Sequence, residues 1–349
     1  MKDRRWTALG GFLVSFLFLL SSALGQAKPV ELKYSMHFET THKQCKLGVA
    51  WGKEVEKRTN GKVKIIMFPG GTLTPSPQNY DGVMKGISDV GLSWFSYTQG
   101  KFPLMEAGNY PLVYKSGMAA TLLANELYKK FKPKELDGVK VLYLAGHGPG
   151  ILHTRDRPVR KLEDVQGLKI RCGGRSDQIA KALGGVPVKI PIGECYDALK
   201  KGIFGGMFVS LEAMEQWRFG EVLKYSIGNF GSAYSSIMFV VMNKQKWNSL
   251  PPDVQKTIEE INQEWIVKTG KLWDEVDQSA KEWILKRGNE YISLSEAEDQ
   301  RWAKAMAPIL DEYIRDAEKK GVPGKAVLEF ALERLKQLNK ENPGPLTSP

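Results

Sequence analysis

Cysteine and histidine are scarce in this sequence, and their scarcity excludes several kinds of site. The 349 residues include 3 Cys and 4 His, with no Cys-x-x-Cys or His-x-x-x-His spacing. We therefore expect no metal site. Cys172 and Cys195 each follow a strand-like segment, which leaves open whether they form a disulfide or remain separate, buried thiols like Cys45.

Motifs of covalent and phosphate chemistry are also missing. No Ser or Cys lies in a Gly-x-Ser-x-Gly elbow. The glycine-rich segment Gly146–Gly150 lacks the Lys-Ser/Thr ending of a P-loop. An enzyme is therefore disfavoured, and we interpret Gly146–Gly150 as a crossing between two domains.

Long apolar runs are absent except near the N-terminus. Lys2, Arg4 and Arg5 precede an apolar stretch over 12–20, and small residues follow up to Ala27. The stretch is shorter than the ~20 residues that span a bilayer. This pattern predicts a signal peptide over 1–27, cleaved near Ala27, so that the mature protein is exported. An uncleaved N-terminal anchor is the alternative.

Positive charge is in excess, but it is not concentrated in any one segment. The formal net charge is +11, and the basic residues are spread along the chain without a basic, aromatic-rich helix. Nucleic acid is therefore not expected as a partner. A positive field attracts anionic solutes instead. The mature chain, about 320 residues, is long enough for two domains.

Strand and helix patterns alternate through most of the chain, which predicts an α/β fold with open parallel sheets. From Pro251 onward the chain changes to long helical patterns, and Gly270 predicts a bend in the first of them. Strands are expected over 30–36, 63–68, 90–94, 139–145, 167–171, 187–190 and 237–243, and helices over 45–59, 79–85, 176–183, 194–200, 253–287, 295–320 and 325–339.

One arginine carries the functional argument. Arg171 ends an apolar strand just before the Gly173-Gly174 turn. A guanidinium in such a place can pair with both oxygens of a carboxylate, which predicts a binder of a small organic acid. The alternative interpretation is a surface ion pair at a strand end.

Several short motifs, in order over nearly the whole mature sequence, resemble the solute-binding proteins of tripartite ATP-independent periplasmic (TRAP) transporters. They occupy residues 59–63, 68–73, 83–90, 102–104, 110–114, 162–171, 182–188, 194–199, 241–243 and 247–251. The longest is Leu162–Arg171, Leu-Glu-Asp-Val-Gln-Gly-Leu-Lys-Ile-Arg.

The resemblance implies a two-lobed periplasmic-binding-protein fold with crossing strands and one long helix that spans both lobes. Lobe I is expected over 28–148 and 237–276, lobe II over 149–236 and 277–340, and a disordered tail over 341–349. The resemblance also implies that Arg171 binds the ligand carboxylate. The protein would be a periplasmic monomer without cofactor or catalysis, delivering an organic acid to TRAP permease subunits. A partner of a periplasmic sensor kinase and a binder from an ATP-driven system are the alternatives.

The chain departs from the family where other members place polar ligand contacts. A Gly-Gly-Met-Phe-Val-Ser run over 205–210 replaces an Asp-Gly-Gln-Glu-Asn-like run, and no second arginine occurs near Ile151. Aromatic residues follow the strand that starts at Val90. We therefore expect an aromatic or apolar monocarboxylate, such as an aromatic 2-oxo acid like indole-3-pyruvate, with a sugar acid or dicarboxylate as the alternative. The candidate ligand-binding residues besides Arg171 are Trp94, Phe95, Phe38, Phe208, Val209, Ser210, Tyr234 and His153.

Overall fold

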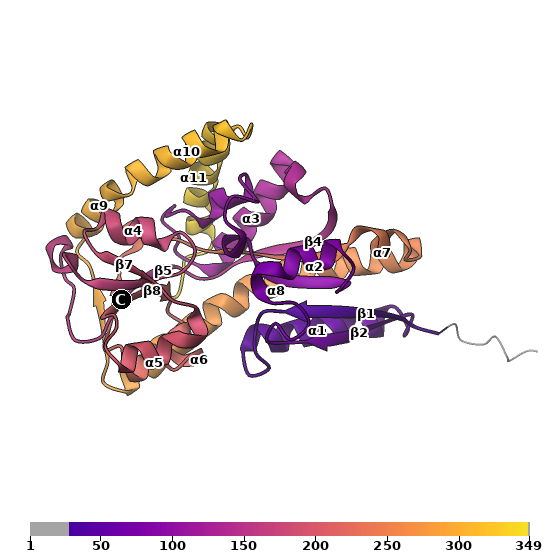
Figure 1. The fold of residues 1–349 in the computed structure, drawn as a ribbon, viewed down its shortest axis with the longest axis horizontal. Coiled ribbons are helices and arrows are strands. Elements are labelled where there is room, and N and C mark those ends of the chain that lie inside the picture. Colours follow the sequence, from indigo (N-terminus) through magenta and orange to yellow (C-terminus); the bar gives the residue numbers. More distant parts are fainter. Residues whose placement is uncertain (1–27, 348–349) are drawn as a thin grey trace, which may run out of the picture.

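Two β-sheets organise residues 28–347, the part of the chain that the computed structural model describes. The predicted signal peptide over 1–27 lies outside the described residues. Figure 1 shows the two sheets apart from each other, with helices around both. The strands are β1 (Val30–Met36), β2 (Val63–Phe68), β3 (Val90–Trp94), β4 (Val139–Gly146), β5 (Gly150–Thr154), β6 (Lys169–Cys172), β7 (Val186–Lys189), β8 (Gly206–Ser210), β9 (Tyr225–Gly228), β10 (Ile237–Asn243) and β11 (Glu290–Ser293).

The first sheet has the strand order β2-β1-β3-β10-β4. Strands β1, β2 and β3 are parallel, and they alternate along the chain with α1 (Lys43–Arg58) and α2 (Asn79–Met84). Helix α1 begins where His42 Nδ1 accepts a hydrogen bond from the Gln44 backbone N–H. It buries Trp51 and Val55. The predicted α/β pattern of this lobe is confirmed.

The second sheet has the strand order β11-β9-β5-β8-β6-β7. Strand β6 pairs in parallel with β7 and β8, whereas β5 runs antiparallel to β8 and β9. Three short helices accompany it: α4 (Ser176–Ala182), α5 (Cys195–Lys200) and α6 (Ala213–Gln216). The parallel strands end on the side that faces the first sheet, and there they position the candidate site.

Two chain segments cross between the lobes side by side. One follows β4 at Gly146 and enters β5 at Gly150, as the glycine-rich sequence predicted. The other returns from β9 to β10 and passes the first at Tyr234, whose carbonyl accepts a hydrogen bond from the Gly150 N–H at 2.7 Å. Strand β10 then lies between β3 and β4 and is almost wholly buried.

Helix α8 (Pro252–Lys286) is the third connection, and it spans both lobes (Figure 1). It packs on α1, β4 and α3 (Gly117–Phe131) in one lobe and on α6 and β11 in the other. The helix runs through Gly270 without interruption. Glycine is required at this position because a Cβ would lie 2.9 Å from the Met118 Cα of α3.

The C-terminal region differs from the prediction in two ways. The helix expected over 295–320 is two helices, α9 (Glu296–Ala305) and α10 (Ala307–Lys319), because Pro308 lacks an N–H and opens the second one. Residues 277–340, assigned as a whole to lobe II, contact both lobes. Helix α9 packs on the turn Phe230–Ser232 of lobe II, whereas α11 (Gly324–Glu341) packs on α3 of lobe I. The remaining helix is α7 (Lys244–Asn248).

The tail predicted to be disordered is packed as far as the structure describes it. Leu346 is 2% exposed and belongs to a buried apolar cluster with Ile284 of α8. The Asn342 carbonyl accepts a hydrogen bond from Ser116 Oγ at 3.0 Å. Residues 341–347 therefore contact both lobes, and the prediction of disorder over 341–349 is wrong for them. Residues 348–349 lie outside the described residues.

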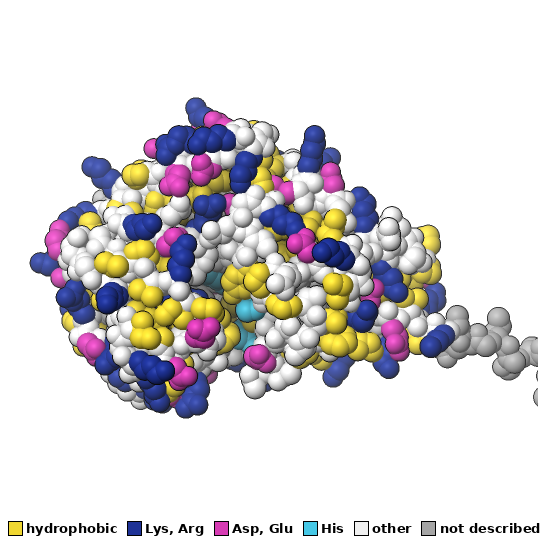
Figure 2. All heavy atoms as spheres, viewed as in Figure 1, with side chains coloured by type: hydrophobic (Ala, Val, Ile, Leu, Met, Phe, Trp, Pro, Cys, Tyr) yellow, Lys and Arg dark blue, Asp and Glu magenta, His cyan; other side chains and the backbone are white. Residues whose placement is uncertain are grey.

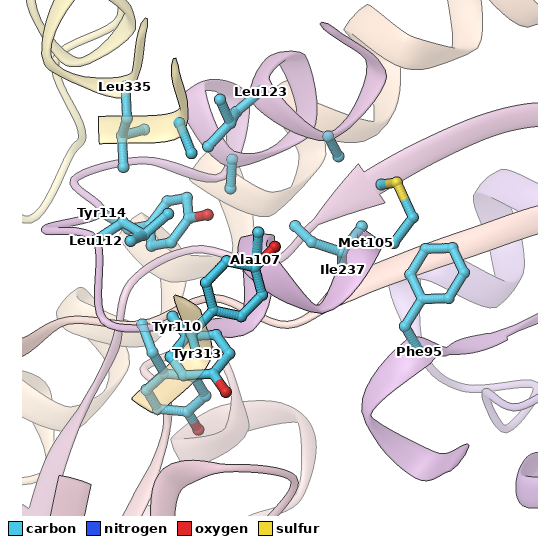
Figure 3. Close-up of a cluster of buried hydrophobic side chains, with 14 of the residues drawn as sticks. Phe95, Met105, Ala107, Tyr110, Leu112, Tyr114, Leu123, Ile237, Tyr313 and Leu335 are labelled. Carbon is cyan, nitrogen blue, oxygen red and sulfur yellow. The ribbon is translucent and has the colours of Figure 1, made fainter. Parts of the chain in front are cut away.

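Within the described residues the apolar core is divided among three clusters, and Figure 3 shows part of the largest, around Tyr110, Tyr114 and Ile237. Helix α3 contributes Leu123 to it and has no counterpart among the predicted elements. Cys45, Cys172 and Cys195 are buried and unbonded to one another. In residues 28–347, no helix combines the length and apolarity needed to cross a membrane.

Candidate ligand-binding site

A narrow cleft lies between the two lobes, with a free volume of about 70 Å³. Figure 2 shows a hollow at this place, with histidine and apolar side chains at its edge. Its walls come from the C-terminal ends of β1, β3, β6 and β8, from the two crossing segments and from α8. Loops at these strand ends are where open α/β sheets bind their ligands.

Arg171, near the end of β6, brings a buried positive charge to this cleft. Its side chain is held by one hydrogen bond, from Nε to the Ile190 carbonyl at 3.0 Å. The residue is only 7% exposed, and no carboxylate of residues 28–347 lies within ion-pair distance of it. A Cβ at Gly173 would lie 3.2 Å from Nη1, so that glycine leaves room for the guanidinium. Both Nη groups can therefore bind an anion from the cleft.

Two tyrosines stand near this guanidinium. Tyr97 lines the cleft, and burial raises the pKa of its hydroxyl despite the opposing charge of Arg171. Burial likewise raises the pKa of Tyr234, whose hydroxyl donates a hydrogen bond to the Phe208 carbonyl at 3.3 Å. Both hydroxyls are therefore protonated at neutral pH, and Tyr97 can donate a hydrogen bond to a bound anion.

An aromatic wall occupies the opposite side of the cleft. Phe38 follows β1, Trp94 ends β3 and Trp273 comes from α8. The Trp94 ring centroid lies 5.9 Å from that of Phe38 and 6.2 Å from that of Trp273. Edge-to-face and tilted packing of this kind holds the rings rigid, and leaves apolar surface for a flat ligand.

Two histidines of the cleft are neutral. His147 lies on the first crossing, where Nε2 accepts a hydrogen bond from the Ser236 N–H at 3.0 Å and Nδ1 donates to the Gly148 carbonyl. Burial lowers its pKa to about 4. Burial, with a smaller effect of His42, also lowers the pKa of His37 to about 4. Neither ring adds a positive charge to that of Arg171 at neutral pH.

Among the described residues, Glu212 is the one acidic group that lines the cleft. It follows β8, is 5% exposed and accepts a hydrogen bond from Ser210 Oγ through Oε1 at 3.3 Å. Its Oε2 lies 3.6 Å from His42 Nε2 of the other lobe, and has no hydrogen-bond partner among the described residues. The cleft therefore combines one cation, one acid and an apolar wall.

Comparison with known proteins identifies the family of this chain. Residues 35–316 match the family model described as bacterial extracellular solute-binding protein, family 7. The chain belongs to this family. Family 7 comprises the solute-binding proteins of TRAP transporters, which are periplasmic, bind small organic acids for transport and work with a membrane permease. The chain is thus a TRAP solute-binding protein and not an enzyme.

Two curated relatives support this assignment. A solute-binding protein of Albidiferax ferrireducens is 28% identical over 262 residues, which cover 71% of this chain and 75% of the relative. The 2,3-diketo-L-gulonate-binding periplasmic protein of Escherichia coli is 27% identical over 285 residues, which cover 80% of this chain and 84% of the relative.

Three solved structures have the same fold. A TRAP periplasmic solute-binding protein from Desulfovibrio salexigens is 32% identical, with a TM-score of 0.82 over 90% of this chain and 97% of the other. A marine metagenome TRAP protein specific for aromatic acids, in complex with metahydroxyphenylacetate, is 27% identical, with a TM-score of 0.82 over 89% and 99%. A Rhodoferax ferrireducens TRAP protein with copurified benzoate is 25% identical, with a TM-score of 0.83 over 89% and 99%.

The fold of this TRAP solute-binding protein brings most of the sequence-predicted site residues together. The cleft lining includes Arg171, Phe38, Trp94, Val209, Ser210 and Tyr234. It also includes Gly173 and Gly174, the turn that the sequence placed after Arg171.

Three predicted site residues lie elsewhere. Phe95 is fully buried in the core of lobe I (Figure 3), because a short turn of 3-10 helix after β3 directs Tyr97 to the cleft instead. Phe208 points to the opposite face of β8 from Val209, as alternation along a strand requires. His153 is fully buried on β5, where its nitrogens bond Ser226 Oγ and the Val209 carbonyl.

The sequence did not single out nine of the described lining residues, and four of these bear on the ligand: Tyr97, His147, Trp273 and Glu212. Tyr97 was noticed only as part of an aromatic run, and His147 only inside the crossing segment. Trp273 belongs to the apolar stripe of α8, a pattern typical of core residues. Glu212 had a usable signal, since it is an acid two residues beyond a wholly buried strand.

A second arginine and a metal centre are both missing from the described part of the cleft. The nearby Arg175 is instead paired with Glu106 across the lobes and stacks over Tyr110. No group of three or more His, Cys, Asp or Glu side chains in residues 28–347 is arranged to hold a metal ion. The positive charge available to a ligand thus comes from Arg171.

Proposed function

We propose that this TRAP solute-binding protein captures an aromatic monocarboxylate in the interlobe cleft and delivers it to its permease. An aromatic 2-oxo acid such as indole-3-pyruvate is a concrete candidate. The observation that carries the proposal is the buried Arg171 guanidinium, which has two free Nη groups and faces a wall of aromatic rings.

The buried charge of Arg171 favours a carboxylate at one end of the ligand. A buried cation without a counter-ion is costly, and a carboxylate in the cleft offsets that cost when the geometry is favourable. The hydrogen bond from Nε to Ile190 holds the guanidinium in place before the ligand arrives. Tyr97 adds a further donor from the other lobe, so that a bound carboxylate would contact both lobes and favour their closure.

The wall opposite Arg171 favours an aromatic body for the ligand. Phe38, Trp94 and Trp273 present apolar ring surface, while both ring nitrogens of His147 are already bonded within the protein. A polyhydroxylated acid would leave most of its hydroxyls unpaired against these rings, at a cost of about 1–3 kcal/mol each. The two structural relatives that bind metahydroxyphenylacetate and benzoate support an aromatic acid.

A sugar acid is the second candidate. It is favoured by the relative from Escherichia coli, which is named for binding 2,3-diketo-L-gulonate. The two candidates differ in what the wall opposite Arg171 must supply, since a sugar acid needs hydrogen-bond partners and an aromatic acid needs ring surface.

The test compares acids of matched charge on the mature protein after unfolding, dialysis and refolding have removed any bound solute. Thermal shift and calorimetry would use indole-3-pyruvate, phenylpyruvate, benzoate, glucuronate and succinate. Ligand at 100-fold its Kd stabilises the native state by about 2.7 kcal/mol, which raises the Tm visibly. Aromatic acids alone should produce the shift. A response to glucuronate or succinate alone would reject the proposal.

The remaining expectations concern the mature protein as a whole. We infer that the chain is cleaved near Ala27 on export and that it acts as a monomer. Intact-mass measurement of periplasmic protein should give the mass of a chain beginning near Lys28. Light scattering after size exclusion should give the mass of one mature chain, and twice that mass would reject the monomer.

A further inference from the structure

Binding of an organic acid at Arg171 gives no role to one carboxylate of the cleft, that of Glu212. Glu212 lines the cleft, is 5% exposed, and its Oε2 has no hydrogen-bond partner among the described residues. A ligand carboxylate cannot bind it, because two negative charges repel each other. The nearest donor is His42 Nε2, which carries the ring proton because Nδ1 accepts from the Gln44 N–H, but at 3.6 Å it is too far from Oε2 for a hydrogen bond. A buried carboxylate oxygen without a hydrogen bond is costly, so a donor brought by the ligand would stabilise it.

Two hydrogen bonds, one from the backbone and one to the side chain, hold Glu212 in position. Its N–H donates to Asp277 Oδ1 of α8 at 2.8 Å, and its Oε1 accepts from Ser210 Oγ. Burial, with a smaller contribution from the charge of Glu212, raises the pKa of Asp277 well above its usual range.

Glu212 belongs to the aromatic end of the cleft. Its neighbour His42 stacks on Phe38 at a centroid distance of 4.4 Å and lies 6.3 Å from the Trp273 ring. Arg171 is instead anchored to Ile190, beyond β7. A ligand whose carboxylate is at Arg171 and whose ring lies on the aromatic wall thus directs its far edge toward Glu212.

We propose that Glu212 accepts a hydrogen bond from the far edge of the bound acid. The protein would then select aromatic monocarboxylates that carry a neutral donor on the ring, either an indole-type N–H or a phenolic O–H. This inference rests on the proposed function and narrows it. It makes Glu212 a specificity-determining residue, because an acid without the donor leaves the carboxylate unpaired.

A purely structural role for Glu212 is the competing explanation. His42 belongs to lobe I and Glu212 to lobe II, so their contact at 3.6 Å could serve only to hold the lobes together. In that case removal of Glu212 would weaken the binding of every acid by the same factor. A ligand contact predicts a loss confined to acids that carry the donor.

The test uses pairs of acids that have the same shape and differ only in the donor. Indole-3-acetate is compared with benzofuran-3-acetate, and 2-, 3- and 4-hydroxyphenylacetate with their fluoro analogues. Calorimetry measures Kd for the mature wild-type chain, for Glu212→Leu and for Glu212→Gln. The matched control is Glu215→Gln, three residues further on and outside the cleft lining, where Oε2 accepts from Ser279 Oγ.

In the wild type, at least one donor-bearing acid should bind about tenfold more tightly than its partner. That ratio should fall to near one in Glu212→Leu, decrease in Glu212→Gln and stay unchanged in Glu215→Gln. Equal affinities within every wild-type pair would overturn the inference while leaving the proposed function intact, even if the variants fail to fold. A uniform loss across all acids in Glu212→Leu would show the structural role. Failure of every aromatic acid to bind the wild type would reject the proposed function and the inference together.

Discussion

Replacing Arg171 tests the origin of carboxylate affinity most directly. The side chain is buried, its Nε is bonded to Ile190, and its two Nη groups are free to bind both oxygens of one carboxylate. Each charge-assisted hydrogen bond contributes about 1.5–3 kcal/mol. Arg171→Met should therefore weaken binding of an aromatic acid by about 3–5 kcal/mol, which is a factor of about 10²–10³ or more in Kd.

Arg171→Lys separates charge from geometry. A lysine keeps the positive charge but has neither the planar fork nor the Nε–H that donates to Ile190. Its Kd should lie between those of the wild type and Arg171→Met. The ligand-free Arg171→Met protein should not lose stability, because the substitution removes a buried charge that has no counter-ion.

The assay is calorimetry on refolded protein with the tightest acid from the panel, and its control is Arg155→Met. Arg155 is also an arginine of lobe II that donates to a backbone carbonyl, that of Leu199, but it lies outside the cleft lining. Arg155→Met should leave Kd unchanged. If Arg171→Met binds the same acid within about threefold of the wild type, the guanidinium is not the carboxylate anchor.

Three further predictions concern stability and closure. Burial lowers the pKa of His153 from 6.5 to about 4, so as the pH falls through this range the unfolded state is protonated first and the folded state loses stability. The wild-type unfolding free energy should therefore fall between pH 7 and pH 5, and in His153→Asn this fall should be smaller by about 2 kcal/mol. An equal fall in both proteins would contradict the prediction. Leu346→Ala should lower the unfolding free energy, measured with urea, by about 2–3 kcal/mol, because Leu346 is buried. Leu332 is exposed, so Leu332→Ala should have little effect. Equal losses in the two variants would contradict the packing of the tail. Glu106→Gln breaks the ion pair between the buried Glu106 and the half-buried Arg175 across the lobes, so it should weaken ligand binding and enlarge the radius of gyration in solution scattering. A wild-type radius and Kd would show that the pair does not hold the lobes closed.

Regular periodicity made the fold predictable where packing follows it. The buried residues of α8, from Val254 to Ile284, recur at helical spacing, so the helix was predicted to within one residue at each end. Prediction failed where one residue overrides the pattern. The apolar spacing of Trp302, Ile309 and Tyr313 continues through Pro308, yet the missing N–H divides the helix there. The tail was misjudged because one buried leucine, Leu346, outweighs its polar and proline-rich composition.

The sequence by itself determined the alternating α/β pattern, the crossing at Gly146–Gly150 and the arginine at the end of β6, because alternation, helical spacing and turn residues are local properties. The two-lobed arrangement followed from the resemblance to TRAP solute-binding proteins. Only the tertiary structure decided which side chains reach the cleft. The short turn after β3 buries Phe95 in the core and directs Tyr97 to the cleft. Helix α8 runs behind both lobes and places Trp273 in the cleft lining. Glu212 meets His42 across 170 residues of chain, and no local pattern encodes the closing of two lobes on each other.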